Sequence, residues 1–201
     1  MKDFSKTQIR TRILPGQPQV KEDSAPPCTV IIFGALGDLA RRKLIPALYN
    51  LHQEGDLPGN FSVLGFNRDK TDDDGFRDKQ KKSTNLYSHK KPEEWDSFAK
   101  NLHYIPGDFT ESDSYLKLRR KLEEVESTHC TDGNRIFYLA TPARFFPLIL
   151  EQLQSAELLH EPDGKPWSRV IIEKPFGSDL ASAKELNTLV GKRLSESQTY
   201  R

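Results

Sequence analysis

Apolar and polar residues follow one another along this chain in blocks that predict alternating strands and helices. Short β-branched and aromatic runs predict strands at residues 29–33, 61–66, 102–106, 135–141 and 167–175. Apolar residues at helical spacing predict helices over about residues 38–54, 76–82, 93–100, 145–159 and 179–194. Strands that are so continuously apolar are typical of a parallel sheet covered on both faces. With right-handed crossovers, the pattern predicts an α/β fold with a doubly wound parallel sheet.

One more helix is predicted between the third and fourth strands. Ser112 or Ser114 is a candidate cap for its first turn. Four apolar residues recur there at helical spacing, namely Tyr115, Leu118, Leu122 and Val125. By contrast, residues 1–27 show no periodicity and are rich in proline, so we expect a flexible arm there and a single domain over residues 28–201.

The composition argues against several classes of protein. The 201 residues carry a net charge of only +1, with acidic and basic side chains interspersed, so no basic field for nucleic acid is expected. No apolar run suits a membrane span, and the N-terminus lacks the apolar core of a signal peptide. The two cysteines, Cys28 and Cys130, fit neither a disulfide framework nor a metal cluster. We therefore expect free thiols, no bound metal and a cytoplasmic location.

The most informative stretch is TVIIFGALGDLARRK, residues 29–43. A strand breaks at Gly34, turns through Gly37 and opens into a helix, an arrangement in which nucleotide phosphates rest on backbone N–H groups. The usual middle glycine of G-x-G-x-x-G is replaced by Ala35–Leu36, whereas Gly37 permits close backbone approach and Ala40 permits close helix packing. A purely structural turn between a strand and a helix would show the same pattern.

Three positive charges, Arg41, Arg42 and Lys43, follow this turn. A solvated face would explain them, but cations in a first helical turn oppose the helix dipole unless an anion lies nearby. This conflict favours an anion-binding turn.

Arg68 follows the second predicted strand, where NAD-binding sequences carry an acid for the ribose hydroxyls. An arginine at this place pairs with a 2′-phosphate, which favours NADP over NAD. Asp69 as the ribose acid, and Arg68 as an ordinary surface charge, are the alternatives.

Taken together, FGALGDLARRKLIPALYNL, GFNRD, FYLATP and RVIIEKPFG resemble the glucose-6-phosphate dehydrogenase family, from about residue 28 to residue 201. The resemblance implies a Rossmann-type domain that binds NADP, with the second β+α domain of the family absent from this chain. It implies oxidation of glucose 6-phosphate to 6-phosphogluconolactone, the entry step of the pentose phosphate pathway. It also implies a homo-oligomer whose interface lies mainly in the second domain.

The resemblance implies a set of site residues as well. Lys174 matches a lysine that touches both coenzyme and sugar phosphate substrate. The coenzyme-binding residues that it implies are Gly34, Ala35, Leu36, Gly37, Asp38, Leu39, Ala40, Arg41, Lys43, Arg68, Asp108, Phe109, Tyr138, Ala140, Pro142 and Lys174.

The residues around Lys174 support this interpretation independently. Ligands of open α/β sheets gather at the carboxyl ends of strands, and Glu173–Lys174–Pro175 lies at such an end. Pro175 biases Lys174 toward an extended backbone, and the bond between them is a candidate cis peptide. A surface lysine that packs its stem on apolar atoms is the alternative.

The resemblance also implies residues that this chain does not contain. In the family, an Ile-Asp-His-Tyr-Leu-Gly-Lys motif follows and binds the substrate phosphate, and a later histidine is the general base. None of the five histidines here matches, and all are expected on helix faces or in loops: His52, His89, His103, His129 and His160. We therefore expect no catalytic residue in this chain and no turnover by it alone. Two hypotheses remain: the coenzyme-binding part of such a dehydrogenase, or a stand-alone NADP-binding module.

Overall fold

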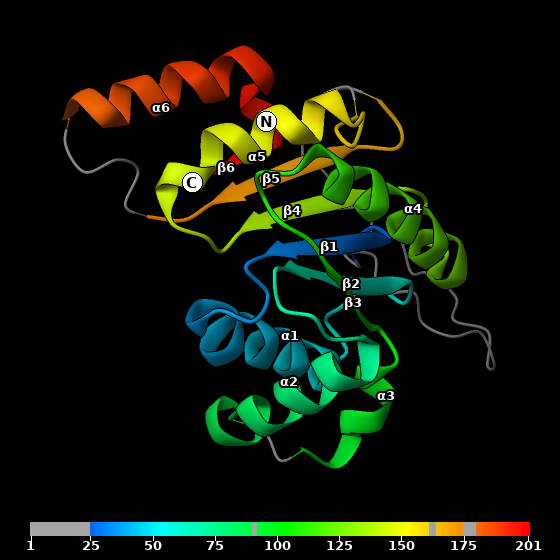
Figure 1. Cartoon of the computed structure of the whole chain (residues 1–201). Coiled ribbons are helices and arrows are strands. Elements are labelled where there is room, and N and C mark those ends of the chain that lie inside the picture. The colour runs from blue at the N-terminus through cyan, green and yellow to red at the C-terminus, as the bar shows by residue number, and fades with distance from the viewer. Residues whose placement is uncertain (1–24, 90–91, 161–163, 175–179) are drawn as a thin grey trace, which may run out of the picture.

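A six-stranded parallel sheet forms the centre of the molecule (Figure 1). The computed structural model describes residues 25–89, 92–160, 164–174 and 180–201. The strands lie in the order β3-β2-β1-β4-β5-β6, and every neighbouring pair is parallel. Their bounds are β1 Cys28–Phe33, β2 Phe61–Asn67, β3 Leu102–Pro106, β4 Arg135–Leu139, β5 Ser168–Ile172 and β6 Thr199–Tyr200. This strand order confirms the predicted doubly wound α/β fold.

Helices cover both faces of the sheet (Figure 1). One face carries α1 Ile45–Glu54, α2 Asp73–Tyr87 and α3 Trp95–Ala99, and the other carries α4 Ser112–His129, α5 Phe146–Ser155 and α6 Leu180–Arg193. The helical segment that ends with α1 begins at Asp38 and contains a π-helical turn, Ala40–Leu44. Pro46 follows that turn and has no N–H to donate to the carbonyl four residues before it, which favours the wider hydrogen-bonding pattern there.

Each face of the sheet has its own apolar core, because successive side chains of a strand point to opposite sides. Ile31 and Phe33 of β1 pack with α4, α5 and α6, whereas Val30 and Ile32 pack with α1, α2 and α3. All six residues of β1 are buried, as expected for the central strand of a sheet covered on both faces.

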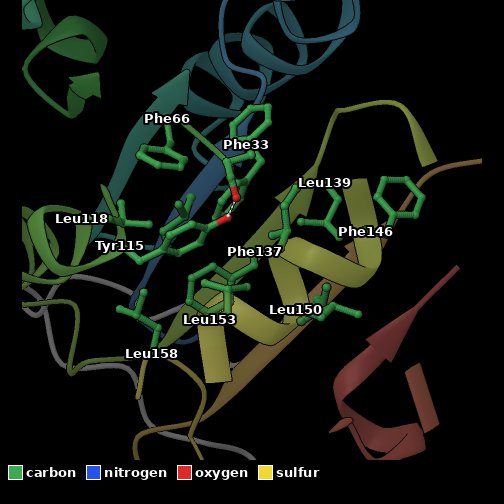
Figure 2. Close-up of a cluster of buried hydrophobic side chains, with 14 of the residues drawn as sticks. Phe33, Phe66, Tyr115, Leu118, Phe137, Leu139, Phe146, Leu150, Leu153 and Leu158 are labelled. Carbon is green, nitrogen blue, oxygen red and sulfur yellow. Dashed lines mark hydrogen bonds between the residues drawn. The ribbon is translucent and has the colours of Figure 1, made fainter. Parts of the chain in front are cut away.

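Aromatic rings fill the first of these cores below the carboxyl end of β1 (Figure 2). The ring centroid of Phe33 lies 5.1 Å from that of Phe66 in an edge-on arrangement and 6.1 Å from that of Tyr115. The Tyr115 hydroxyl donates a hydrogen bond of 3.0 Å to the carbonyl of Phe109. Burial of each such side chain contributes about 1.5–3 kcal/mol, so the loops that leave these strands start from a rigid base.

Helix α4 confirms the predicted buried face but not the predicted cap. Tyr115, Leu118, Leu122 and Val125 are all buried. The residue before the helix is Glu111, and no side chain caps the first turn. Ser114 is buried, and its hydroxyl instead accepts a hydrogen bond of 3.1 Å from the N–H of Asp108.

Several element bounds differ from prediction. Helix α2 is longer than the predicted 76–82 at both ends, and it starts earlier because Asp72 caps it by accepting from the N–H of Gly75 at 2.9 Å. Helix α5 is shorter than predicted and follows a 3-10 turn, Ala143–Phe145. β4 and β5 are shorter than predicted, and β6 was not predicted, because two residues are too few for an alternating pattern.

The remaining expectations concern thiols, metal and membrane. Cys28 is buried at the start of β1, Cys130 is exposed after α4, and both are free thiols as predicted. Within the described residues, no cluster of three or more metal-ligating side chains occurs. No helix in the described part of the chain is long and apolar enough to cross a membrane. Residues 1–24 of the predicted arm lie outside the described residues.

Candidate functional site

The carboxyl ends of the strands bring the predicted site residues to one edge of the sheet. After β1, the chain forms β2 and β3 on one side of it and then β4, β5 and β6 on the other. The strand order therefore reverses beside β1. Open α/β sheets bind ligands in the crevice outside such a reversal. The residues that follow β1, β2, β3, β4 and β5 here are Gly34, Arg68, Gly107–Asp108, Ala140 and Glu173–Lys174.

The glycine turn is held tightly against its neighbours at this edge. The N–H of Gly34 donates to the carbonyl of Phe66 at 2.9 Å, and the N–H of Gly37 donates back to the carbonyl of Gly34 at 2.8 Å. Gly34 has φ of +82°, and a Cβ added to it would lie 2.5 Å from the carbonyl oxygen of Ala140. Only glycine therefore fits at this position without strain. Gly37 does not adopt a left-handed conformation.

Backbone N–H groups of the turn remain available for a ligand. Among the contacts described, the N–H groups of Ala35 and Leu36 have no hydrogen-bond partner. Ala35 is fully buried and Leu36 is half-buried, so the N–H of Leu36 is the one of the two that a ligand can reach. The helix that begins at Asp38 adds the free N–H groups of its first turn. Ala40 is fully buried, as its predicted role in close packing requires, and Leu39 precedes it without a side-chain cap. These groups form a cradle for an anion.

The three cations after the turn differ in their surroundings. Arg42 pairs with Asp38 at 3.2 Å, and its guanidinium lies 5.3 Å from the ring centroid of Tyr87. The Asp38–Arg42 pair thus relieves part of the conflict with the helix dipole that favoured an anion-binding turn. Arg41 donates to the hydroxyl of Ser83 at 3.2 Å. Lys43 is exposed and has no ion pair among the described residues.

Arg68 and Asp108 lie near each other at the ends of β2 and β3. Arg68 is exposed. Asp108 accepts from the N–H of Thr110 at 2.8 Å and from its hydroxyl at 2.7 Å. These two bonds, with a smaller effect of the Arg68 charge, hold the pKa of Asp108 below its ordinary value. The alternative ribose acid, Asp69, accepts instead from the side-chain amide of Asn67 at 2.7 Å.

The side chain of Phe109, which was predicted to contact the coenzyme, is buried. Its ring is buried in the core, with centroid distances of 5.9 Å to Phe33 and 5.7 Å to Phe66. The Phe109 side chain therefore packs in the core beneath the site, and its carbonyl accepts a hydrogen bond from the hydroxyl of Tyr115.

The other side of the crevice is formed by the ends of β4 and β5. The half-buried Tyr138 donates from its hydroxyl to the carboxylate of Glu173, directly before the exposed Lys174. Ala140 donates to the carbonyl of Phe33 at 3.0 Å, and Pro142 is exposed before the 3-10 turn. The candidate cis bond before Pro175 lies outside the described residues.

Two polar residues near the turn were not predicted, Gln80 and Ser83, and a third, Thr141, lies within the matched strand end FYLATP. Gln80 donates to the carbonyl of Ala35, and Ser83 receives Arg41. The hydroxyl of Thr141 is buried with no hydrogen-bond partner among the described residues. Gln80 could have been found from sequence, since it follows Phe76 by four residues and so shares the buried face of a predicted helix.

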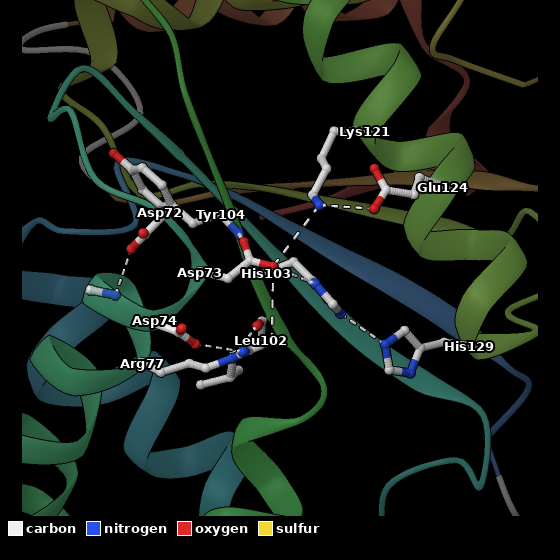
Figure 3. A network of polar contacts seen from close by, with 11 residues as sticks. Asp72, Asp73, Asp74, Arg77, Leu102, His103, Tyr104, Lys121, Glu124 and His129 are labelled. Carbon is white, nitrogen blue, oxygen red and sulfur yellow. Dashed lines mark hydrogen bonds and ion pairs between the residues drawn. The ribbon is translucent and has the colours of Figure 1, made fainter.

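Among the described histidines, His89 lines a pocket with Lys43, and the other four have their contacts elsewhere. His103 is part of β3, so the prediction of a helix-face or loop context was wrong for it. It contacts Asp73 of α2 through Nδ1 at 3.0 Å and His129 of α4 through Nε2 at 2.8 Å (Figure 3). His52 contacts Ser97 at 3.0 Å, and His160 contacts the carbonyl of Gly133 at 3.1 Å.

Comparison with known proteins agrees with this arrangement. A family model described as glucose-6-phosphate dehydrogenase, NAD binding domain, matches residues 31–201. Glucose-6-phosphate 1-dehydrogenase of Chlamydia pneumoniae is 42% identical over 184 residues, which are 88% of this chain and 35% of that protein. The Bacillus subtilis (strain 168) enzyme of the same name is 38% identical, over 90% of this chain and 36% of its own length.

Solved structures give the same result. A structure of glucose-6-phosphate dehydrogenase in complex with its substrate glucose-6-phosphate matches with a TM-score of 0.75 and 33% identity, over 88% of this chain and 36% of that one. The Mycobacterium avium glucose-6-phosphate 1-dehydrogenase matches with a TM-score of 0.74 and 31% identity, over the same shares of the two chains. The chain thus spans about a third of the length of the relatives it matches. With its strand order, glycine turn and family match in agreement, the chain belongs to the glucose-6-phosphate dehydrogenase family and corresponds to the NAD-binding domain of that family.

Proposed function

We propose that this chain is the coenzyme-binding part of an NADP-dependent glucose-6-phosphate dehydrogenase. The observation that carries the proposal is the pairing of the free N–H groups of Leu36 and of the first helical turn with an exposed arginine, Arg68, beyond the neighbouring strand. The first fits a pyrophosphate and the second fits a 2′-phosphate. The proposed reaction is oxidation of glucose 6-phosphate to the 6-phosphogluconolactone.

The choice of NADP over NAD rests on the surroundings of Arg68. A free 2′-hydroxyl is ordinarily bound by a carboxylate at the end of the second strand, and the residue directly after β2 here is Arg68 rather than an acid. A 2′-phosphate requires a donor, and an arginine presents its N–H groups in a planar fork that suits phosphate. The site residues thus fit the phosphorylated coenzyme better.

In this proposal, the residues of this chain bind and orient the coenzyme. The turn at 34–37 and the following helix hold the pyrophosphate, Arg68 holds the 2′-phosphate, and the ends of β4 and β5 face the nicotinamide. When bound, the nicotinamide accepts a hydride from the sugar. In the same proposal, Lys174, which is exposed after β5, donates to the substrate. Assembly of the complete enzyme into a homo-oligomer stays a prediction.

Binding of the two coenzymes to the chain tests this proposal. We expect NADP⁺ to bind more tightly than NAD⁺ in a fluorescence or calorimetric titration. Arg68→Ala should weaken NADP⁺ by about 10- to 100-fold, the range for one charge-assisted hydrogen-bonded contact, and should change NAD⁺ affinity by less than about twofold. Arg120→Ala, an exposed arginine on α4, is the matched control. Equal losses for both coenzymes would refute the assignment of Arg68.

The alternative function is a stand-alone NADP-binding module without dehydrogenase activity. Both hypotheses predict coenzyme binding and no turnover by the 201 residues alone. A steady-state assay with glucose 6-phosphate and NADP⁺ checks the second point. If the reading frame continues beyond Arg201 with an Ile-Asp-His-Tyr-Leu-Gly-Lys motif, and the longer chain turns over, the dehydrogenase assignment stands and the module is excluded.

A further inference from the structure

Gln80 reaches from the inner face of α2 to the glycine turn. Its side-chain amide donates to the carbonyl of Ala35 at 3.0 Å. The residue is fully buried, and its Oε1 has no hydrogen-bond partner among the described residues. A buried glutamine that leaves its acceptor unpaired costs free energy. This cost indicates that the hydrogen bond donated by the Gln80 amide has a role.

Through the geometry of the peptide bond, the hydrogen bond from Gln80 also sets the direction of the N–H of Leu36. The carbonyl of Ala35 and the N–H of Leu36 belong to one planar trans peptide unit, so they point in opposite directions. Because Gln80 holds the carbonyl toward α2, the N–H of Leu36 points away from α2. This N–H is one of the two in the turn that have no partner among the described contacts.

The close packing of the turn on β2 and α2 makes this contact possible. A Cβ added to Gly65 would lie 2.9 Å from the Cβ of Ala35 and 2.9 Å from the ring of Phe76. The absence of a side chain at Gly65 therefore lets the turn, β2 and α2 meet. Three residues after Gln80, the buried Ser83 accepts from Arg41 at 3.2 Å. Helix α2 thus contacts the turn and the helix after it through two neighbouring positions.

We propose that Gln80 is a positioning residue that fixes the Ala35–Leu36 peptide with its N–H toward the coenzyme pyrophosphate. The inference rests on the proposed coenzyme-binding function and deepens it. Without the amide donor, the peptide is free to rotate, and the N–H of Leu36 is no longer held in the orientation that an anion needs. Gln80 itself does not touch the coenzyme.

Gln80→Met tests the proposal, because methionine fills a similar volume but has no N–H. We expect NADP⁺ and NAD⁺ to bind about three- to tenfold more weakly, by the same factor for both, since both carry the pyrophosphate. This equal loss distinguishes Gln80 from Arg68. The matched control is Thr84→Val, one helical turn further along α2, where the buried hydroxyl has no hydrogen-bond partner among the described residues and so does not hold the turn by a hydrogen bond. It should bind both coenzymes as the unchanged chain does.

A second variant and a second measurement guard against simple loss of folding. Gln80→Asn keeps the amide but shortens its reach, and should weaken both coenzymes in the same way. In both variants, the ¹⁵N–¹H resonance of Leu36 should shift in the free protein and respond less to NADP⁺, whereas the resonances of α4 should not. Folded Gln80 variants that bind NADP⁺ within twofold of the unchanged chain would overturn the proposal. If the unchanged chain does not bind either coenzyme, the proposed function fails first.

Discussion

The hydroxyl of Tyr138 in β4 donates a hydrogen bond to the carboxylate of Glu173, directly after β5. Burial, and then the bond to Glu173 and its negative charge, raise the pKa of Tyr138 well above its ordinary value of 10.0. The phenol therefore stays protonated and remains a donor at neutral pH. The contact links the ends of two adjacent strands at the edge that carries Lys174.

Tyr138→Phe should lower the free energy of unfolding by about 1.5–3 kcal/mol, the range for a hydrogen bond to a charged group, because Glu173 loses its donor. Urea unfolding of the two proteins measures the difference. Tyr87→Phe is the control, since Tyr87 is 41% exposed and offers its ring rather than its hydroxyl to Arg42. A Tyr138 variant no less stable than this control would contradict the inferred link.

Gly34→Ala should be among the most damaging single changes at the edge. An alanine there must adopt φ of +82°, and its Cβ would lie 2.5 Å from the carbonyl oxygen of Ala140. The left-handed conformation alone costs about 1–2 kcal/mol, and the clash adds to it. Gly59→Ala, where an added Cβ meets no atom within 4 Å, should change stability by much less. Thermal unfolding of both variants checks this, and similar midpoints would refute it.

The architecture can be predicted from sequence because most strands are short, strongly apolar runs of residues. The runs at 29–33 and 61–66 are buried on both sides, as central parallel strands require, and they match β1 and β2 closely. The run at 102–106 matches β3, an edge strand whose residues are only partly buried. The edge strand β6 has only two residues and could not be predicted. The length of α2 was missed because its first turn depends on a cap at Asp72, while its surface is almost entirely polar.

The position of a site residue was predictable where it follows a strand directly, whereas its contact with the coenzyme stays a prediction. The strand ends place Gly34, Arg68 and Lys174 at one edge, as the sequence indicates. The sequence did not indicate that the Phe109 ring faces the core, or that Gln80 contacts Ala35 from 45 residues away. Such a contact depends on how α2 packs on the sheet, and hydrophobic periodicity predicts the buried face of a helix but not its neighbour.

Arg135 and Glu126 form an ion pair that is nearly buried, at the amino end of β4. Arg135 Nε and Nη2 donate to the two carboxylate oxygens at 2.7 and 3.0 Å, and Nη1 donates to the carbonyl of Leu158 at 3.1 Å. The two side chains are 8% and 11% exposed.

Removal of one partner of this pair should cost far more than removal of both. Arg135→Met should lower the free energy of unfolding by about 3–5 kcal/mol, since Glu126 is left buried without a counter-charge. The double variant Arg135→Met, Glu126→Leu should recover much of that loss. Denaturant unfolding of the single and double variants completes a double-mutant cycle. Purely additive effects would show that the pair is not coupled.

The polar network of Figure 3 joins α2, β3 and α4 through Asp73, His103 and His129. Burial opposes ionisation of Asp73, but the hydrogen bonds from His103 and from the N–H of Tyr104, with the charges of His103 and Lys121, outweigh it and lower its pKa below 3.8. Burial, and then the charges of His103 and Arg77, lower the pKa of His129 below 6.5.

Both shifts make the fold less stable as the pH falls, in two separate windows. Because the folded state disfavours protonated His129, its contribution is present above pH 6.5 and is lost below it as the unfolded chain takes up the proton. The contribution of Asp73 is present above pH 3.8 and is lost as the pH falls further. The Nε2 atoms of His103 and His129, 2.8 Å apart, can share only one proton, so protonation of both breaks the contact.

His129→Gln should therefore flatten the fall in stability between pH 7 and about pH 5, the window in which an ordinary histidine titrates. Glutamine keeps a polar partner for His103 but takes up no proton. Urea midpoints at several pH values measure the slope for the variant and for the unchanged chain. Thr128→Ala, an exposed neighbour on α4 that does not titrate, should retain the original slope. If the two variants lose stability equally as the pH falls, proton uptake at His129 does not contribute, and the acid sensitivity of the fold must arise at another group whose pKa burial lowers, such as His160.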